Sequence, residues 1–403
     1  MSTTSIKEYF PALNQKIRGK DFTYLDSAAT TLKPRSVIEA LTQYYTYDTA
    51  NIHRGAHFLA NKGTTAFEDT RDLVANFINA AHREEIIFTK GTTDSINLIA
   101  ATFGERFIND GDEIILSTLE HHSNIIPWQL LSSRKKITIK YIPIDGNGDL
   151  ILSEYRKLFT SKTKLVSITH VSNVLGTVNP IKELISFAHT QGVPILIDGA
   201  QSINHILIDV QELDCDFYAF SAHKMFGPNG VGVLYAKQTI LEELPPYQGG
   251  GNMIDQVGEI SSTYNKIPHK FEAGTPAIGE VIAFAEAIKF IKAIGQKQIS
   301  KYDEDLLKYT ITKLSPISGL KIIGNPAKRS GVVSFTLENV HSYDLGSILD
   351  MQGIAIRTGN HCAQQLMKCL NLTSIARASF TIYNTNSDID RLADGIRKVK
   401  DFL

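Results

Sequence analysis

Three short apolar runs, each closed by polar or turn residues, lie close together in the middle of the chain. They cover residues 195–197, 217–220 and 231–236. Runs this short, without alternating polar positions, are typical of strands buried on both faces of a sheet. Ligands bind such sheets beyond the carboxyl ends of the strands. We therefore expect Asp198, after the first run, and Lys224, shortly after the second, to project into one crevice.

Strand-like and helix-like segments alternate over the rest of the chain. A strand, a turn and a helix near Pro34 are expected in residues 24–41, and residues 64–78 have helical spacing. A turn at residues 90–95 should open a helix at Ile96, and from about residue 293 helices are mixed with short strands. The pattern predicts an α/β fold with a large domain, residues 23–293, and a smaller α/β domain, residues 294–403 with 1–22.

Composition and charge exclude several classes of protein. The chain of 403 residues has 41 Lys and Arg against 42 Asp and Glu, a net charge of -1, so neither nucleic acid nor a membrane is a predicted partner. The first residues do not resemble a signal peptide and no apolar run is long enough to span a bilayer, which favours a cytoplasmic protein. Three cysteines without a CxxC pair predict neither a disulfide scaffold nor a metal site.

The residues around the expected crevice indicate a cofactor. A carboxylate, Asp198, and an amine, Lys224, suit a ring with a basic nitrogen and an aldehyde, which is the chemistry of pyridoxal phosphate. Taken singly, each residue is equally typical of a strand end or a solvated loop. Thr92 and Thr93 follow a strand and precede a helix, where backbone N–H groups and hydroxyls can bind a phosphate. His121, at another strand end, could stack on the ring.

A second stretch of interest is residues 356–367, in the smaller domain. A strand ends there, Gly359 permits a tight turn, and a helix is expected to begin close to Cys362. Arg357 and His361 are near in sequence, and cationic neighbours favour the thiolate form of a cysteine. Cys215 and Cys369 are interpreted as small core residues.

The motifs of the whole chain, taken in order, resemble those of SufS-type, or group II, cysteine desulfurases. These enzymes belong to the class V aminotransferase group of fold-type I pyridoxal phosphate enzymes. The motifs are LDSAAT, HRG, EHHSN, THVSNVLGT, DGAQ, SAHKMFGP, FEAGTP, RTGNHCA and ARASF. The resemblance implies a large domain with a mostly parallel seven-stranded sheet between helices, and a smaller C-terminal α/β domain that carries the cysteine loop.

The resemblance also implies a role for each matching residue. Catalysis would fall to Lys224, which forms the Schiff base and moves the Cα proton, to Cys362 and to His121, which stacks on the ring. The remaining residues implied to bind the cofactor are Asp198, Gln201, Asn173, Thr92, Thr93, Ser221, His223 and, from the neighbouring subunit of a homodimer, Thr275. Those implied to bind substrate are Arg377, Asn173, Arg357 and His53.

The activity implied is conversion of L-cysteine to L-alanine with a persulfide left on Cys362. A SufE-like or SufU-like acceptor would pass the sulfur to Suf proteins for iron-sulfur cluster assembly. Two alternatives stay open, a selenocysteine lyase or other class V pyridoxal phosphate lyase, and a non-catalytic scaffold in cluster assembly. Asn360 stands where the family usually has His, and Gln365 where it usually has Pro. These departures bear on the choice between sulfur and selenium and on acceptor docking.

Overall fold

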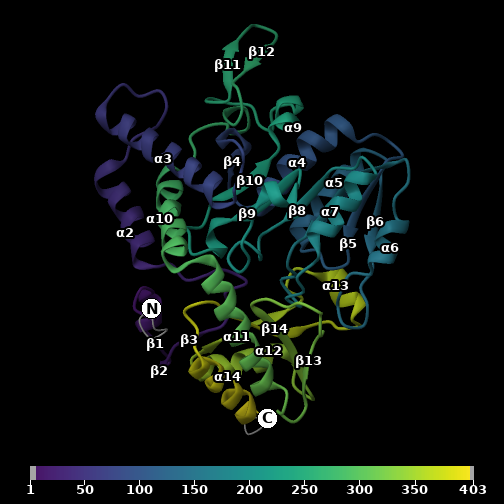
Figure 1. Ribbon diagram of the computed structural model, residues 1–403. Coiled ribbons are helices and arrows are strands. Elements are labelled where there is room, and N and C mark those ends of the chain that lie inside the picture. The colour runs from purple at the N-terminus through teal and green to yellow at the C-terminus, as the bar shows by residue number, and fades with distance from the viewer. Residues whose placement is uncertain (1–5, 400–403) are drawn as a thin grey trace.

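The computed structural model describes residues 6–399, and it contains a large sheet and a smaller one, each packed against helices (Figure 1). Residues 1–5 and 400–403, which the sequence assigns to the smaller domain, lie outside the described residues. The smaller sheet and the helices around it occupy the lower part of the view in Figure 1, and the large sheet lies above them.

The large sheet has seven strands and is mostly parallel, as predicted. Strand β10 runs antiparallel to both of its neighbours, whereas the other neighbouring pairs are parallel. In spatial order the strands are β4 (Ile86–Thr89), β10 (Gly232–Ala236), β9 (Phe217–Ser221), β8 (Ile195–Asp198), β7 (Thr163–Thr169), β5 (Glu113–Ser117) and β6 (Thr138–Ile142).

Both faces of this sheet are buried, which explains the continuous apolar runs. Ile195 and Ile197 face one core while Leu196 faces another, and all three are fully buried. Burial of such a side chain stabilises the fold by about 1.5–3 kcal/mol. The first core is shared with α3 (Phe58–Phe77), α7 (Ile181–Thr190) and α10 (Ile278–Ile294), and the second with α4 (Thr92–Phe107) and α5 (Ile126–Arg134).

The smaller sheet has four antiparallel strands and a core of its own. Its strands, in spatial order, are β13 (Leu320–Ile322), β14 (Val332–Leu337), β17 (Ile375–Ser379) and β16 (Arg357–Gly359). Helices α11 (Gln296–Leu314), α12 (Ser342–Met351) and α14 (Asn386–Val399) complete that core. The short strand β3 (Thr23–Tyr24) pairs with β15 (Ile354–Ala355), so the chain near residue 23 lies beside this part. The division into residues 23–293 and the remainder stays a proposal.

Short elements join these layers. The helical ones are η1 (Pro11–Asn14), α2 (Arg35–Gln43), η2 (Tyr44–Asp48), η3 (Arg83–Glu85), η4 (His122–Asn124), α6 (Leu152–Lys157), α8 (Val210–Leu213), η5 (Ala222–Lys224), α9 (Gln238–Glu243), η6 (His269–Phe271) and α13 (Gln364–Cys369). The extended ones are β1 (Lys16–Ile17), β2 (Lys20–Asp21), β11 (Ile254–Val257) and β12 (Ser262–Tyr264). The β11–β12 hairpin projects from the top of the molecule in Figure 1.

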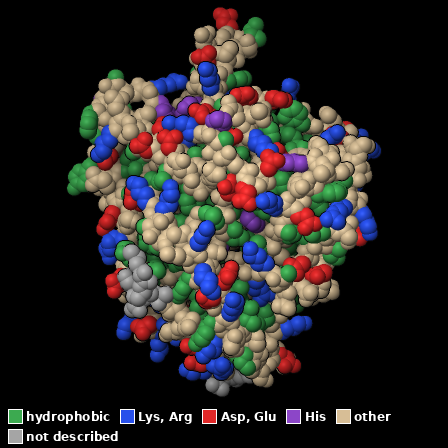
Figure 2. Space-filling view, viewed as in Figure 1, with side chains coloured by type: hydrophobic (Ala, Val, Ile, Leu, Met, Phe, Trp, Pro, Cys, Tyr) green, Lys and Arg blue, Asp and Glu red, His purple; other side chains and the backbone are tan. Residues whose placement is uncertain are grey.

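The surface agrees with the balanced charge. Acidic and basic side chains are interspersed over the face shown in Figure 2, without a large area of one sign. Within residues 6–399, none of the helices combines the length and the apolar character needed to cross a bilayer.

Two local predictions were wrong. Helix α4 begins at Thr92 rather than Ile96, because Gly91 at its N-cap has a φ of 155° and allows the helix to start directly after the strand. Cys369 is exposed at the end of α13 instead of lying in the core, whereas Cys215 is buried as predicted. The earlier helix start places Thr92 and Thr93 in the first turn of α4.

Candidate functional site

A cavity of about 230 Å³ lies at the carboxyl ends of the large sheet's strands, and the smaller sheet closes part of it. The large sheet contributes the ends of β7, β8 and β9 and the loop after β5. The smaller sheet contributes β17 and the loop between β16 and α13. Its lining consists of Ala28, Ala29, Thr92, Thr93, His121, Ser123, Thr169, Val171, Asn173, Asp198, Ala200, Gln201, Ser221, His223, Lys224, Arg357, His361, Cys362 and Arg377.

Asp198 and Lys224 share this cavity, as the strand pattern predicted. Asp198 is the last residue of β8, and its Oδ1 accepts the Ala200 N–H at 2.9 Å. Burial raises the pKa of Asp198, although the Ala200 N–H and the Lys224 charge oppose this. Burial lowers the pKa of Lys224 to about 8, against the opposing effect of Asp198. The amine is therefore partly neutral near physiological pH, as a nucleophile that attacks an aldehyde must be.

An anion-binding cradle lies at the N-terminus of α4. The Thr92 N–H donates to Ser221 Oγ at 2.8 Å, and the Thr92 and Ser221 hydroxyls are 2.7 Å apart. The Thr93 hydroxyl is 2.7 Å from that of Ser123. A helix N-terminus with these four hydroxyl groups beside it is suited to a phosphate group. Gly232 is needed here because a Cβ atom on it would lie 2.3 Å from the Gly91 Cα.

His121 lines the cavity as a neutral ring. Its Nδ1 accepts the Ser123 N–H at 3.1 Å, so the ring proton is on Nε2. Burial, followed by the Lys224 charge, lowers the pKa of His121 to about 3. Burial likewise lowers the pKa of His223 to about 4, so neither ring is cationic near neutral pH. Gln201 is buried beside them and donates from Nε2 to the Ala28 carbonyl at 2.7 Å.

Arg377 provides a buried cation on the opposite side of the cavity. Its Nη1 donates to the Asn173 carbonyl and its Nη2 to Asp26 Oδ1, each at 2.9 Å. Among the described residues no partner is found for its buried Nε. Arg357 on β16 lies opposite Arg377 on β17, and its Nη1 is 3.6 Å from Asp26 Oδ2. Two guanidinium groups anchored in this way are suited to a carboxylate.

Cys362 is half-buried in the turn between β16 and α13. His361 is also buried, and its Nε2 donates to the Ile375 carbonyl at 3.2 Å. Burial lowers the pKa of His361 to about 3, so this ring supplies no positive charge to the neighbouring thiol. The suggestion that His361 favours the thiolate as a cation is therefore wrong, because the ring is enclosed by the second sheet.

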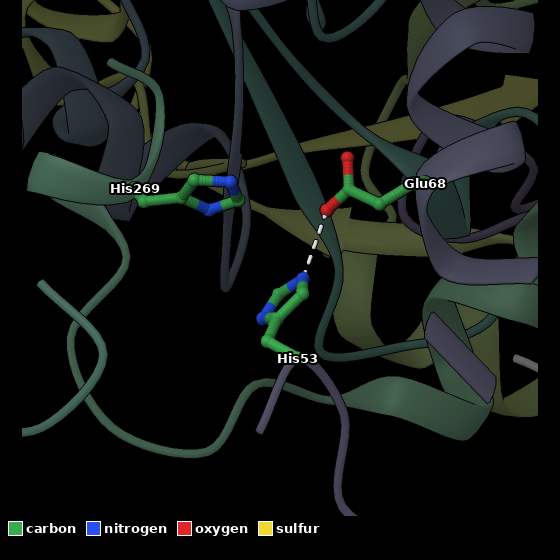
Figure 3. Close-up of side chains that lie close together, drawn as sticks. All are labelled: His53, Glu68 and His269. Atoms are coloured by element: carbon green, nitrogen blue, oxygen red, sulfur yellow. Dashed lines mark hydrogen bonds and ion pairs between the residues drawn. The ribbon is translucent and has the colours of Figure 1, made fainter. Parts of the chain in front are cut away.

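Two predicted residues lie outside the lining of the cavity. Thr275 is exposed, in the loop after η6. The His53 Nε2 lies 3.0 Å from Glu68 Oε1, and Figure 3 shows His269 close to both of these side chains. Thr275 and His53 do not line the cavity with the other predicted cofactor-binding and substrate-binding residues of their own chain. Their roles remain predictions.

The cluster of His53, Glu68 and His269 has the composition of a metal site but not its electrostatics. The ligand atoms lie within 4.8 Å of one another. However, Glu68 Oε2 accepts from Arg71 Nε at 3.0 Å and from Arg83 Nη2 at 2.7 Å. Two guanidinium groups on the only carboxylate of the cluster oppose the binding of a divalent cation. We therefore assign these residues to an ion-pair network.

Sequence reasoning left three contributors without a role. Ser123 and Thr169 line the cavity, and Asp26 anchors both arginines. Asp26 and Ser123 fall inside the motifs LDSAAT and EHHSN, and Thr169 opens THVSNVLGT. Their position inside these motifs was the signal that could have identified them.

Taken together, the residues present fit pyridoxal 5′-phosphate. The buried Asp198 carboxylate suits a pyridinium nitrogen, the Lys224 amine suits the aldehyde, and the α4 N-terminus with Ser221 suits the phosphate. A neutral His121 can lie against the ring without charge repulsion.

Comparison with known proteins gives the family. The aminotransferase class-V family matches residues 23–392. A probable cysteine desulfurase of Halalkalibacterium halodurans is 49% identical over 403 residues, covering 100% of this chain and 99% of the relative. The cysteine desulfurase of Escherichia coli O9:H4 is 44% identical, with the same coverage. In three dimensions, the Escherichia coli cysteine desulfurase CsdA superposes with a TM-score of 0.93 at 35% identity, covering 100% of this chain and 99% of that one.

The family depends on pyridoxal 5′-phosphate, so this is the cofactor of the chain. The curated relatives match the chain over its whole length, and the solved relative shares its fold. The chain therefore belongs to the class-V aminotransferase family and, within it, to the cysteine desulfurases.

Proposed function

We propose that this protein converts L-cysteine to L-alanine and leaves the sulfur as a persulfide on Cys362. The observation that carries the proposal is the convergence of an amine, a carboxylate-binding arginine and a thiol, Lys224, Arg377 and Cys362, on one cavity from two different sheets. This reaction requires an amine that binds the cofactor aldehyde and moves a proton, a group that anchors the substrate, and a thiol that accepts the sulfur.

The cofactor would be held by the side chains already described. Asp198 would pair with its ring nitrogen, Gln201 and Asn173 would lie beside the ring, and the α4 cradle with His223 would bind the phosphate. When bound, pyridoxal phosphate supplies an electron sink that stabilises negative charge at the substrate Cα.

The protein's own residues would then divide the work. Arg377, with Arg357, binds the substrate carboxylate. The Lys224 amine removes the Cα proton, and burial assists this step because it keeps part of the amine neutral. The Cys362 thiolate attacks the substrate sulfur, so an S–S bond forms as the Cβ–S bond breaks. The electron pair of the broken bond stays with the carbon skeleton, which takes up a proton at Cβ, regains one at Cα from Lys224 and leaves as alanine.

We propose in addition that the enzyme acts as a cytoplasmic homodimer and passes sulfur to a SufE-like or SufU-like acceptor for iron-sulfur cluster assembly. The exposed position of Thr275, outside its own chain's cavity, supports a contribution from this residue to the site of a second subunit. The short turn that holds Cys362 supports a dedicated acceptor, because a thiol on so short a turn has little reach.

The deciding experiment is single-turnover alanine formation from cysteine by the parent protein and by Cys362→Ala, with mass spectrometry of the peptide that contains residue 362. We expect alanine and a persulfide in the parent and neither in the variant. Full alanine formation by Cys362→Ala, or a parent without persulfide, would favour a selenocysteine lyase or another lyase that needs no thiol. Absence of bound cofactor from the purified parent protein would favour a non-catalytic scaffold in cluster assembly.

A further inference from the structure

The turn that carries Cys362 has an unfavourable backbone. His361 and Cys362 have φ values of 52° and 55°, two consecutive non-glycine residues in the left-handed region. Side chains with a Cβ atom avoid this region, and such conformations persist where the surroundings hold them in place. The position of the thiol therefore depends on the contacts of this turn.

Polar contacts from inside and outside the turn hold it. Within the turn, the Cys362 N–H donates to Asn360 Oδ1 at 3.0 Å. From the large sheet's side, Asn173 Nδ2 donates to the His361 carbonyl at 2.8 Å, and the His122 N–H donates to the Cys362 carbonyl at 2.7 Å. The Gln364 N–H donates back to His122 Nε2 at 3.2 Å.

His122 thus contacts the turn twice, with its main chain at Cys362 itself and with its ring two residues further on, at Gln364. Because a backbone N–H can only donate, Nε2 of His122 must present its lone pair. Burial lowers the pKa of His122 and so favours this neutral form. The preceding residue, His121, lines the cavity, so one short segment fixes both the ring-facing imidazole and the cysteine turn.

We propose that His122 is a positioning residue that holds Cys362 over the cavity through the acceptor on its ring. The inference rests on the proposed persulfide chemistry for its effect on rate, but the hydrogen bond itself can be tested without it. His122 would act on the step in which the thiol attacks sulfur, and not on cofactor or cysteine binding.

Two substitutions separate the acceptor from the shape of the ring. His122→Phe keeps a planar ring but removes the lone pair, and His122→Gln places an amide oxygen at a similar reach. The measurements are amide hydrogen exchange at Gln364, alkylation of Cys362 by iodoacetamide in the cofactor-loaded enzyme, and single-turnover persulfide formation.

For His122→Phe we expect Gln364 exchange to quicken by about 5- to 10-fold, in line with the loss of one hydrogen bond. Persulfide formation should slow by a similar factor with an unchanged KM for cysteine, alkylation of Cys362 should change, and His122→Gln should restore all three values. Parental exchange and rate in His122→Phe would overturn the proposal. Absence of persulfide in every form, with quickened exchange in His122→Phe, would reject the proposed function and leave the positioning role standing.

Discussion

The amine and the thiol line the same cavity, but the chain holds them in different ways. Lys224 ends η5, the short helical turn after β9, and the pairing of β9 with β8 sets Asp198 opposite Ala219. The carbonyl just before the amine, that of His223, accepts from the Thr31 N–H at 2.9 Å and from Lys33 Nζ at 3.0 Å. Cys362 instead sits in a left-handed turn held by side-chain hydrogen bonds.

The difference shows how one cavity can combine a rigidly fixed cofactor side with a thiol that is held by only a few hydrogen bonds. Sheet register positions the cofactor side through many backbone bonds that no single substitution removes. The thiol side depends on a few hydrogen bonds, most of which involve a side chain, so single substitutions there should shift the thiol without disturbing the cofactor. In the proposed function Cys362 passes sulfur to an acceptor protein. The turn that carries Cys362 can be displaced more readily than the sheet that positions Lys224.

The largest expected effect is at the amine. Lys224→Ala should remove the absorbance of the covalently bound cofactor and lower alanine formation at least about 10³-fold, because the amine serves as both Schiff base and proton carrier. Absorbance spectra and single-turnover alanine assays check this, with thermal unfolding as the control for folding. A variant that retains a tenth of the parental rate would contradict the role.

The next largest effect is expected at Arg377, the residue proposed to bind the substrate carboxylate. Arg377→Lys keeps the charge but loses the planar fork that reaches Asn173 and Asp26 at the same time. We expect KM for cysteine to rise about 10- to 100-fold with a smaller fall in kcat, as for loss of a charge-assisted bond. Steady-state kinetics checks this, and a parental KM would remove Arg377 from substrate binding.

A pH profile tests the burial of Lys224 directly. The amine reacts with an aldehyde only when neutral, and burial lowers its pKa to about 8. The rate at which apoprotein takes up pyridoxal phosphate should therefore rise about tenfold per pH unit and level off above about pH 8. Stopped-flow absorbance checks this at constant ionic strength. A rise that continued to the ordinary lysine range, near pH 10.4, would show that the amine is not perturbed.

The smallest effect is expected within the cysteine turn. Asn360→Ala removes the Oδ1 acceptor of the Cys362 N–H and should slow persulfide formation by about 3- to 10-fold, without changing cofactor absorbance. Asn360→His is the matched control, since its Nδ1 stands at the same number of bonds from the backbone. Equal rates for all three proteins would show that the turn does not need this acceptor.

Much of the cofactor side was predictable because it follows from local pattern. Short apolar runs identify strands buried on both faces, and the residues after them must lie at one edge of a parallel sheet. Asp198 and Lys224 were located in this way, His121 was placed at another strand end, and the resemblance added Ser221 and Gln201. The start of α4 was misplaced because Gly91 allowed the helix to begin without a polar capping side chain.

The chain's sequence by itself determined the main strands and the family, and it named the groups that are proposed to react. Only the tertiary structure decided that Asp26 anchors both arginines, that His361 is neutral, and that His122 holds the cysteine turn. Each of these depends on burial or on contacts between residues far apart in the chain. Local periodicity reports which face of an element is buried, but the partner that covers it, and hence the charge state of a histidine, is set by the packing of distant segments.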